Sequence, residues 1–220
     1  MQRSESEDLD GRLLHRMLFF TDAVFAIVMT LLVLELRPPE PGAVLQGADA
    51  LSEMAGHLFA FAMSFGLCGV FWLAHMNSTR RMVRFDWPTT AANLVFLFPV
   101  CLLPFVSAWL GRGSSGDYVW GLYCWLLVAT SAANVLLVAV MSRGRGRLLG
   151  GGMSRRELAY RIARAASPGL AFAVGLVLLA LGQAGLAQMC WTLIALNFWL
   201  ARLLLKPKAV PRDQEPEPRL

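Results

Sequence analysis

Residues 16–36 read RMLFFTDAVFAIVMTLLVLEL, an apolar run with Asp22 near its start and Glu35 near its end. About 20 apolar residues cross the hydrocarbon core of a bilayer as a helix. An Arg-Pro-Pro sequence at 37–39 ends the run, because proline cannot continue a helix. The stretch therefore predicts a membrane-spanning helix from about 15 to 36.

The rest of the chain repeats this pattern. Of its 220 residues, 56% are apolar and only 16% are charged, whereas soluble domains carry about 25% charged residues. We therefore expect an all-α membrane protein with six transmembrane helices and no room for a soluble catalytic domain. Pro99 and Pro104 should kink the third span, and a short amphipathic helix at 154–165 should precede the fifth. The five further spans are expected at about 52–76, 88–110, 118–141, 168–181 and 186–205.

The basic residues predict the orientation of these spans. With six spans, 18 of the 20 lysines and arginines fall in the segments that share a side with the N-terminus, and two fall on the other side. Cytoplasmic loops carry such an excess, so both termini are expected in the cytoplasm. The predicted organisation is a cytoplasmic tail at 1–12, a six-span transmembrane domain at 13–206 and a disordered cytoplasmic tail at 207–220.

The sequence gives little support for a bound cofactor or for nucleic-acid binding. The three histidines share no helix turn, and we expect no metal site and no cofactor. The net charge of +5 reflects the loops, so no nucleic-acid partner is expected. The cysteines lie in apolar runs and should be small buried side chains: Cys68, Cys101, Cys124 and Cys190.

Asp22 is the first candidate functional residue, because an acid within a membrane span is costly and usually has a function. Trp72, His75 and Asn93 are expected at the same depth on the second and third spans, and each can donate a hydrogen bond to its carboxylate. We therefore expect a buried polar network around Asp22. Alternatively, Asp22 lies at the interface and is solvated.

Helical periodicity groups Ile27, Leu31 and Leu34 within about 60° on one face, with Asp22 about 140° away. This apolar stripe is compatible with a pore lining, with ordinary packing or with lipid contact. Arg16 falls near the same stripe, so its spacing does not pair it with Asp22. Either Arg16 reaches another span or subunit, or the helix begins after it.

The sequence RMLFFTD followed by AVFAIVMTLLVLEL resembles the R-x-x-x-F-S-D signature of the transmembrane protein 175 family of potassium channels, with Thr21 in place of the serine. FWLAH at 71–75, Asn93 and LPF at 103–105 are similar to further landmarks of the family. The resemblance covers the first three spans. The last three agree in hydropathy and order only.

The resemblance implies a potassium-permeable cation channel with no enzymatic activity. It also implies a homotetramer in a prokaryotic cell membrane, with potassium ions, membrane lipid and further copies of the chain as partners. The first helix would line the pore, with a constriction at Ile27, Leu31 and Leu34 and a structural polar network of Arg16, Thr21, Asp22, Trp72, His75 and Asn93.

Glu35 should lie at the outer mouth, where a ring of carboxylates concentrates cations, or else be a solvated interfacial acid. Two other functions stay open. One is a small proton-coupled secondary transporter that uses Asp22 and His75 as relay groups, and the other is a membrane scaffold or lipid-binding protein.

The charge asymmetry leads to a prediction of topology. Tags at either terminus, and a cysteine placed at 150–152, should be located on the cytoplasmic side of the membrane. A cysteine at 113–115 should be located on the outer side. The measurement is labelling by a membrane-impermeant thiol reagent in intact cells. A C-terminal tag found outside would contradict the six-span topology.

Overall fold

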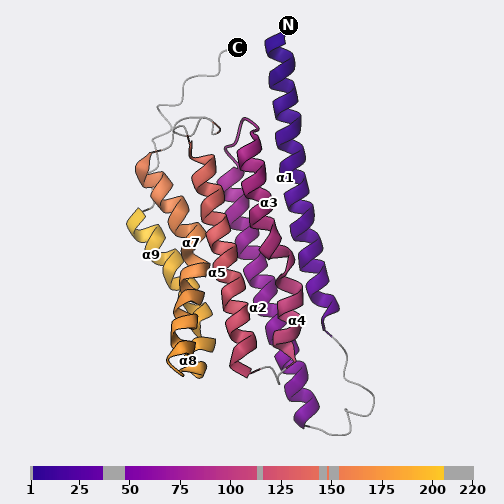
Figure 1. Cartoon of the computed structure of the whole chain (residues 1–220), viewed down its shortest axis with the longest axis vertical. Coiled ribbons are helices and arrows are strands. Elements are labelled where there is room, and N and C mark those ends of the chain that lie inside the picture. The colour runs from indigo at the N-terminus through magenta and orange to yellow at the C-terminus, as the bar shows by residue number, and fades with distance from the viewer. Residues whose placement is uncertain (1, 37–47, 113–115, 144–147, 149–153, 206–220) are drawn as a thin grey trace.

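The chain folds into a bundle of helices that run roughly along one axis (Figure 1). The computed structural model describes residues 2–36, 48–112, 116–143, 148 and 154–205, so the tail expected at 207–220 lies outside the described residues. The helices are α1 Gln2–Leu34, α2 Ala48–Thr79, α3 Trp87–Cys101, α4 Leu103–Gly111, α5 Gly116–Met141, α7 Arg155–Ala180, α8 Ala184–Gln188, the 3₁₀ turn η2 Cys190–Thr192 and α9 Leu193–Leu205.

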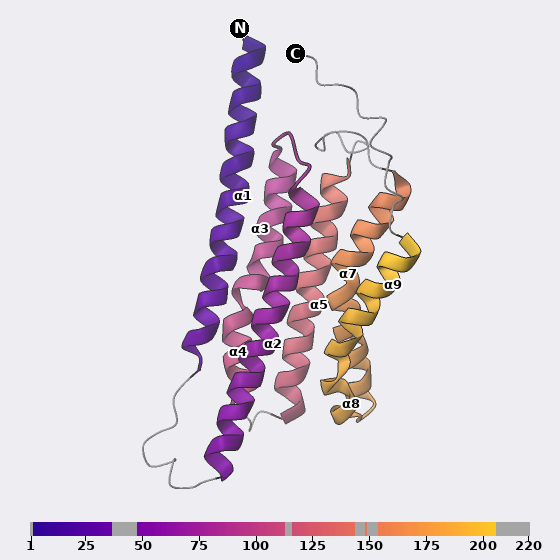
Figure 2. The ribbon, with the colours of Figure 1, turned by 180° about the vertical axis from the view of Figure 1, so that it is seen from behind.

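The expectation of an all-α protein with six spans is confirmed. Six helical segments are long and apolar enough to cross a membrane: Leu9–Leu34, Met54–Thr79, Trp87–Gly111, Gly116–Met141, Arg155–Ala180 and Ala184–Leu204. The N-terminal ends of α1 and α7, the α2–α3 connection and the C-terminal end of α5 lie at one end of the bundle (Figure 2). We call this end, which carries Arg80, Arg84, Arg143 and Arg155, the basic end. That it faces the cytoplasm stays a prediction.

Helix α1 is longer than its apolar run. It contains 33 residues, which corresponds to about 50 Å of helix, whereas the bilayer core is about 30 Å thick. Residues 2–12, expected as a tail, continue the helix and project past the rest of the bundle in Figure 1. A span that is already helical removes the cost of nucleation, so its polar extension can propagate.

The third span breaks at Leu102, as its prolines suggest. Helix α3 ends at Cys101, and α4 begins at Leu103 with Pro104 in its first turn. Pro104 has no N–H for the carbonyl of Val100, and its ring crowds that carbonyl. The N–H of Leu102 instead contacts the carbonyls of Pro99 and Val100, which limits the loss of hydrogen bonds at the break.

The fifth span differs from its expected form. The amphipathic segment at 154–165 and the apolar segment at 168–181 form one continuous helix, α7, with Pro168 inside it. Ser154 caps this helix by accepting a hydrogen bond from the Glu157 N–H at 3.1 Å. Proline lowers helix stability, but Pro168 and Gly169 are buried, and tight packing against α5 outweighs the lost hydrogen bond.

The sixth span is broken where the sequence predicted one helix over 186–205. Helix α8 ends at Gln188, and η2 separates it from α9. In a continuous helix the Ala187 carbonyl would accept from the Trp191 N–H. Here the indole N–H of Trp120 donates to that carbonyl at 3.1 Å, and Cys190 packs against Gly175. Partners on α5 and α7 therefore stabilise the break.

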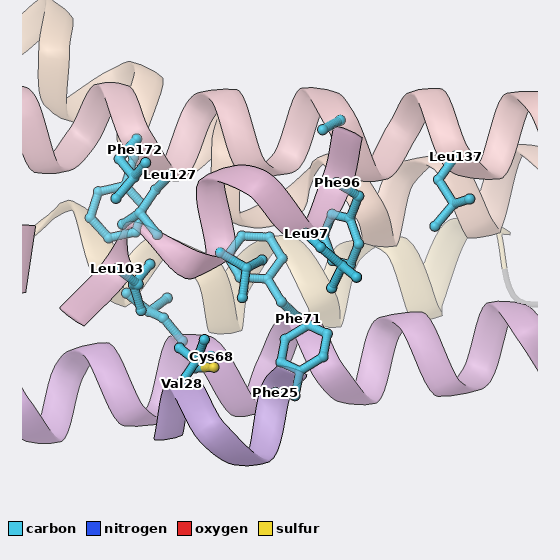
Figure 3. Packing of buried hydrophobic residues seen from close by; sticks show 14 of the residues in the cluster. Phe25, Val28, Cys68, Phe71, Phe96, Leu97, Leu103, Leu127, Leu137 and Phe172 are labelled. Carbon is cyan, nitrogen blue, oxygen red and sulfur yellow. The ribbon is translucent and has the colours of Figure 1, made fainter. Parts of the chain in front are cut away.

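The core is apolar and shared by most of the helices. Figure 3 shows Phe25 and Val28 of α1 among side chains of neighbouring helices, including Phe71 and Phe96. Cys68, Cys124 and Cys190 are buried as expected. Cys101 is exposed, contrary to expectation, because it ends α3 on the side that faces away from the bundle.

The close approach of α5 and α7 generates a prediction. A Cβ atom at Gly169 would lie 2.5 Å from the Cβ of Ser131, whereas a Cβ at Gly66 meets nothing within 4 Å. Gly169→Ala should therefore lower the free energy of unfolding by about 1–3 kcal/mol through overpacking. Gly66→Ala is the control, and it should leave stability unchanged or raise it by up to about 1 kcal/mol. Thermal unfolding of the purified proteins in detergent measures both, and equal stability of the two variants would contradict this packing.

Candidate pore face and polar network

Helix α1 has one buried face and one exposed face. Its buried residues recur every three or four positions along the side that packs against α2, α3 and α4: Leu14, Met17, Thr21, Phe25, Val28 and Leu32. The other side presents large apolar groups, with Ile27 57%, Leu31 42% and Leu34 70% exposed. The stripe found by periodicity is thus an exposed surface of this chain, and not part of its core.

Aromatic packing fixes the buried face of α1. The Phe25 ring lies 6.0 Å from Phe96 of α3 and 6.5 Å from His75 of α2, measured between ring centroids. His75 stacks on Phe96 with parallel rings at 5.9 Å. One aromatic side chain from each of three helices therefore sets how α1 is rotated about its own axis.

Buried hydrogen bonds connect the same three helices. The Asn93 amide nitrogen donates to the Thr21 hydroxyl oxygen at 2.7 Å, and the Asn93 carbonyl oxygen lies 3.0 Å from Nε2 of His75. The Thr21 hydroxyl donates to the Met17 carbonyl at 3.0 Å. We call Thr21, Asn93 and His75 the buried triad, since all three are at most 2% exposed.

The protons of the buried triad follow from these contacts. Because the Thr21 hydroxyl donates its only proton to Met17, its oxygen must accept from Asn93. The Asn93 carbonyl oxygen therefore faces His75, and Nε2 of His75 carries a proton and donates it. Each of these polar groups is satisfied by a partner on another helix or turn.

Asp22 is arranged differently from the expectation. Its carboxylate accepts from the Trp72 indole N–H at 2.9 Å, but Asn93 bonds to Thr21 and His75 instead. Asp22 is also exposed, not buried. The reason is helical geometry: Asp22 lies about 100° around α1 from Thr21, so it points toward α2 and the bundle surface while Thr21 points toward α3.

The remaining candidates lie apart from these contacts. Arg16 is exposed and has no ion pair within the described part of the chain, and α1 does not begin after it, which removes one of the two explanations offered above. Glu35 is partly exposed just beyond the last residue of α1. Thr30, which the sequence analysis did not single out, is exposed beside Ile27 and donates to its carbonyl at 2.8 Å.

A second polar cluster was also missed. The Ser64 hydroxyl of α2 donates to the Ser107 hydroxyl of α4 at 2.9 Å, and Ser107 donates to the Ala60 carbonyl at 3.2 Å. The Tyr123 hydroxyl of α5 lies 2.9 Å from Ser64, whose proton is already used, so Tyr123 is the donor. Small hydroxyl residues in apolar spans were the available signal, but their partners are far away in sequence.

The described residues contain no group of three or more His, Cys, Asp or Glu side chains that could hold a metal ion. An exposed stripe of branched aliphatic side chains has no chemistry to offer a substrate. It can pack against another chain or against lipid, or it can narrow a path for ions.

Comparison with known proteins shows a similarity that is concentrated in residues 16–104. Residues 16–104 match the sequence model of a family described as the endosomal/lysosomal potassium channel TMEM175. A potassium channel of Chryseobacterium sp. (strain P1-3) is 28% identical over 127 residues, which cover 58% of this chain and 64% of the relative. A potassium channel of Streptomyces collinus is 32% identical over 96 residues, 42% of this chain and 45% of the relative.

Two further matches at lower identity are also described as TMEM175 proteins. The endosomal/lysosomal proton channel TMEM175 of Rattus norvegicus is 23% identical over 125 residues, which cover 56% of this chain and 25% of the rat protein. The chain thus spans less than two thirds of the length of these curated relatives. The fold is similar to the crystal structure of a lysosomal potassium-selective channel TMEM175 homolog from Chamaesiphon minutus, with a TM-score of 0.63 at 21% identity over 87% of this chain and 96% of that chain.

The buried triad generates a prediction. Asn93→Ala leaves Nε2 of His75 without its acceptor inside an apolar core, so it should lower the free energy of unfolding by about 1–3 kcal/mol. The adjacent Leu94 is 53% exposed, and Leu94→Ala is the control, expected to change stability by less than about 0.5 kcal/mol. Unfolding in detergent, followed by near-ultraviolet circular dichroism, compares them. A smaller loss for Asn93→Ala than for Leu94→Ala would contradict the role of the triad.

Proposed function

We propose that the chain is a member of the TMEM175 family of potassium channels, whose sequence model matches residues 16–104, and that it forms a potassium-permeable cation channel. The family is one of ion channels and not an enzyme class. The proposed assembly is a homotetramer in a prokaryotic cell membrane, with α1 of each copy lining a common pore. The bacterial relatives that are described as potassium channels support this choice of permeant ion.

The exposed stripe of α1 is the observation that carries the proposal. Helix α1 lies at one edge of the bundle in both views, and its other face is fixed against α2, α3 and α4 (Figures 1 and 2). Nothing in the described part of a single chain encloses Ile27, Leu31 or Leu34. A pore lined by these residues therefore has to form between copies of the chain. The number four rests on the resemblance to the family.

The chemistry of the stripe indicates how such a pore would select ions. Branched aliphatic side chains cannot coordinate a cation, so a ring of Ile27 side chains would narrow the path and disfavour water. An ion would cross partly hydrated, or lose water at a cost in free energy. Potassium holds its water less tightly than sodium because it is the larger ion, so a narrow apolar ring penalises sodium more. Leu31 and Leu34 would extend the constriction toward Glu35 at the outer mouth.

A proton-coupled transporter is the competing function. Its relay groups do not contact each other: Trp72 binds Asp22, and Asn93 binds His75. His75 is also 2% exposed and stacked on Phe96, so it has no open path to water in this conformation. Proton permeation through the channel itself is a second candidate, because the rat relative is described as a proton channel. Flux from proteoliposomes without a coupled substrate separates a channel from a transporter, and a scaffold passes no ions.

The proposed constriction generates a prediction of selectivity. Ile27→Ala or Ile27→Asn should raise conductance and reduce discrimination between potassium and sodium, because either change widens the apolar ring. Leu31 and Leu34 variants should act in the same direction but less strongly. The reversal potential under bi-ionic conditions in planar bilayers is the measurement.

Met29 supplies the matched control. Its side chain is partly buried and faces Gly69 of α2, so Met29→Ala should leave selectivity near that of the wild type. A larger change at Met29 than at Ile27 would place the pore on another face of α1, and the assigned constriction would be wrong.

Asp22 is expected to support assembly and not selectivity. Asp22→Ala removes the acceptor for the Trp72 indole, so the expected phenotype is loss of the tetramer or of current, at a cost of about 1–3 kcal/mol. Asp22→Asn retains a carbonyl acceptor and should assemble. Size-exclusion chromatography and reconstituted potassium flux report the outcome. A stable Asp22→Ala tetramer with normal current would show that Asp22 is not needed for assembly or conduction.

A further inference from the structure

The charges between residues 118 and 212 are almost all positive. Between Asp117 and Asp213 the sequence contains 11 lysines and arginines and a single acid, Glu157. Glu157 accepts hydrogen bonds from Arg81 and Arg161, each at 2.8 Å, on the side of α7 that packs against α2. Glu157 is therefore already paired, and among the described residues it forms no ion pair with the arginines near α9.

Arg164 lies in the seam between α7 and α9. Its guanidinium carbon is 5.7 Å from the centre of the Tyr160 ring and 5.4 Å from the centre of the Phe198 ring. Both distances are within the range of cation–π interactions. Its Nη1 donates to the Tyr160 hydroxyl at 3.2 Å, but its buried Nε has no partner among the described residues. Within the described part of the chain, the positive charge of Arg164 therefore has no carboxylate partner.

Two exposed arginines flank this seam toward the basic end. Nη2 of Arg156 donates to the Leu204 carbonyl at 3.3 Å, which joins the start of α7 to the end of α9. Arg202 is exposed one helical turn beyond Phe198 on α9. We call Arg156, Arg164 and Arg202 the arginine seam.

An apolar stripe begins beside the arginine seam and continues along α9. Leu196, Trp199, Leu200 and Leu203 follow helical spacing, and all are exposed, with Trp199 at 59%. Tryptophan favours the headgroup level of a bilayer. In Figures 1 and 2, α9 lies at the opposite edge of the bundle from α1, so a tetramer that buries α1 at its axis would turn α9 outward, toward lipid.

We propose that the arginine seam binds the headgroup of an anionic phospholipid from the membrane leaflet at the basic end, with the acyl chains along the exposed stripe of α9. Guanidinium groups pair with phosphate through parallel hydrogen bonds, and the exposed guanidinium groups of Arg156 and Arg202 can offer them, while the charge of Arg164 lies behind them in the seam. Headgroup and acyl contacts together favour a lipid over a free anion. This inference rests on the proposed membrane insertion and on the proposed placement of α1 at the axis of the assembly, but not on which residues of α1 form the constriction.

Native mass spectrometry of the full-length protein in detergent tests the proposal. The protein is titrated with dioleoyl phosphatidylglycerol and with dioleoyl phosphatidylcholine, and bound lipids are counted. The wild type should bind phosphatidylglycerol more tightly. Arg156→Gln together with Arg202→Gln should weaken that binding by about 30-fold, on the order of fivefold per arginine, and should leave phosphatidylcholine binding unchanged.

The matched control removes two exposed arginines from the same end, Arg80→Gln together with Arg84→Gln. It should bind phosphatidylglycerol like the wild type, because these residues lie at the α2–α3 connection. If both double variants lost phosphatidylglycerol binding equally, the binding would depend on general charge, and the site would be overturned. Displacement of the lipid by an equal concentration of inorganic phosphate would also overturn it. If the seam variant does not fold, Arg202→Gln alone should still show about a fivefold loss, and no loss would overturn the site.

Because the readout is lipid binding, it is independent of ion flux. A seam variant that loses phosphatidylglycerol while Ile27 variants leave selectivity unchanged would support the lipid site and contradict the pore assignment. A seam variant that keeps phosphatidylglycerol while Ile27 variants lose selectivity would support the pore and overturn the lipid site.

Discussion

The rest of this structure depends on one constraint, which is that a polar group inside an apolar bundle must find its partner in the protein. Asn93 meets this constraint for three helices at once, because its amide bridges Thr21 of α1 and His75 of α2. The bridge and the stacked ring of Phe96 fix the rotation of α1. With that rotation fixed, the stripe that contains Ile27 must face away from the chain's own core.

The two edges of the bundle then acquire different environments. The α1 edge presents aliphatic side chains, and Asp22 lies to one side of them, where it accepts a hydrogen bond from Trp72. The α9 edge presents an aliphatic stripe with arginines at one end. In the proposed assembly the first edge faces other copies of the chain and an ion path, and the second faces lipid. One fold thus separates the surface for ions from the surface for the membrane.

The sequence was sufficient for what depends on local pattern. The six spans, the break near Pro104 and the stripe at Ile27 all follow from apolar run length, proline chemistry and helical periodicity. The break in the sixth span could not be predicted, because its cause is the indole of Trp120, which is distant in sequence.

For the candidate polar site, too, local pattern was predictable and contacts between distant residues were not. Its members were found as polar side chains at one depth, but their pairing was not. A one-residue difference along α1 decides whether a side chain faces α3 or the surface, so Thr21 received the buried contact expected of Asp22. Which donor meets which acceptor depends on the rotation of the packed helices, which periodicity alone does not determine.

Cysteine accessibility along α1 tests the central claim most directly. In a background with the four native cysteines replaced, single cysteines are placed at Ile27, Leu31 and Leu34, which are exposed, and at Val28 and Leu32, which are buried. Potassium flux from proteoliposomes is then measured before and after addition of silver ions. The account predicts that silver blocks flux at the first three positions and leaves it unchanged at the other two. Block at Val28 or Leu32, with none at Ile27, would contradict a pore lined by the exposed face of α1.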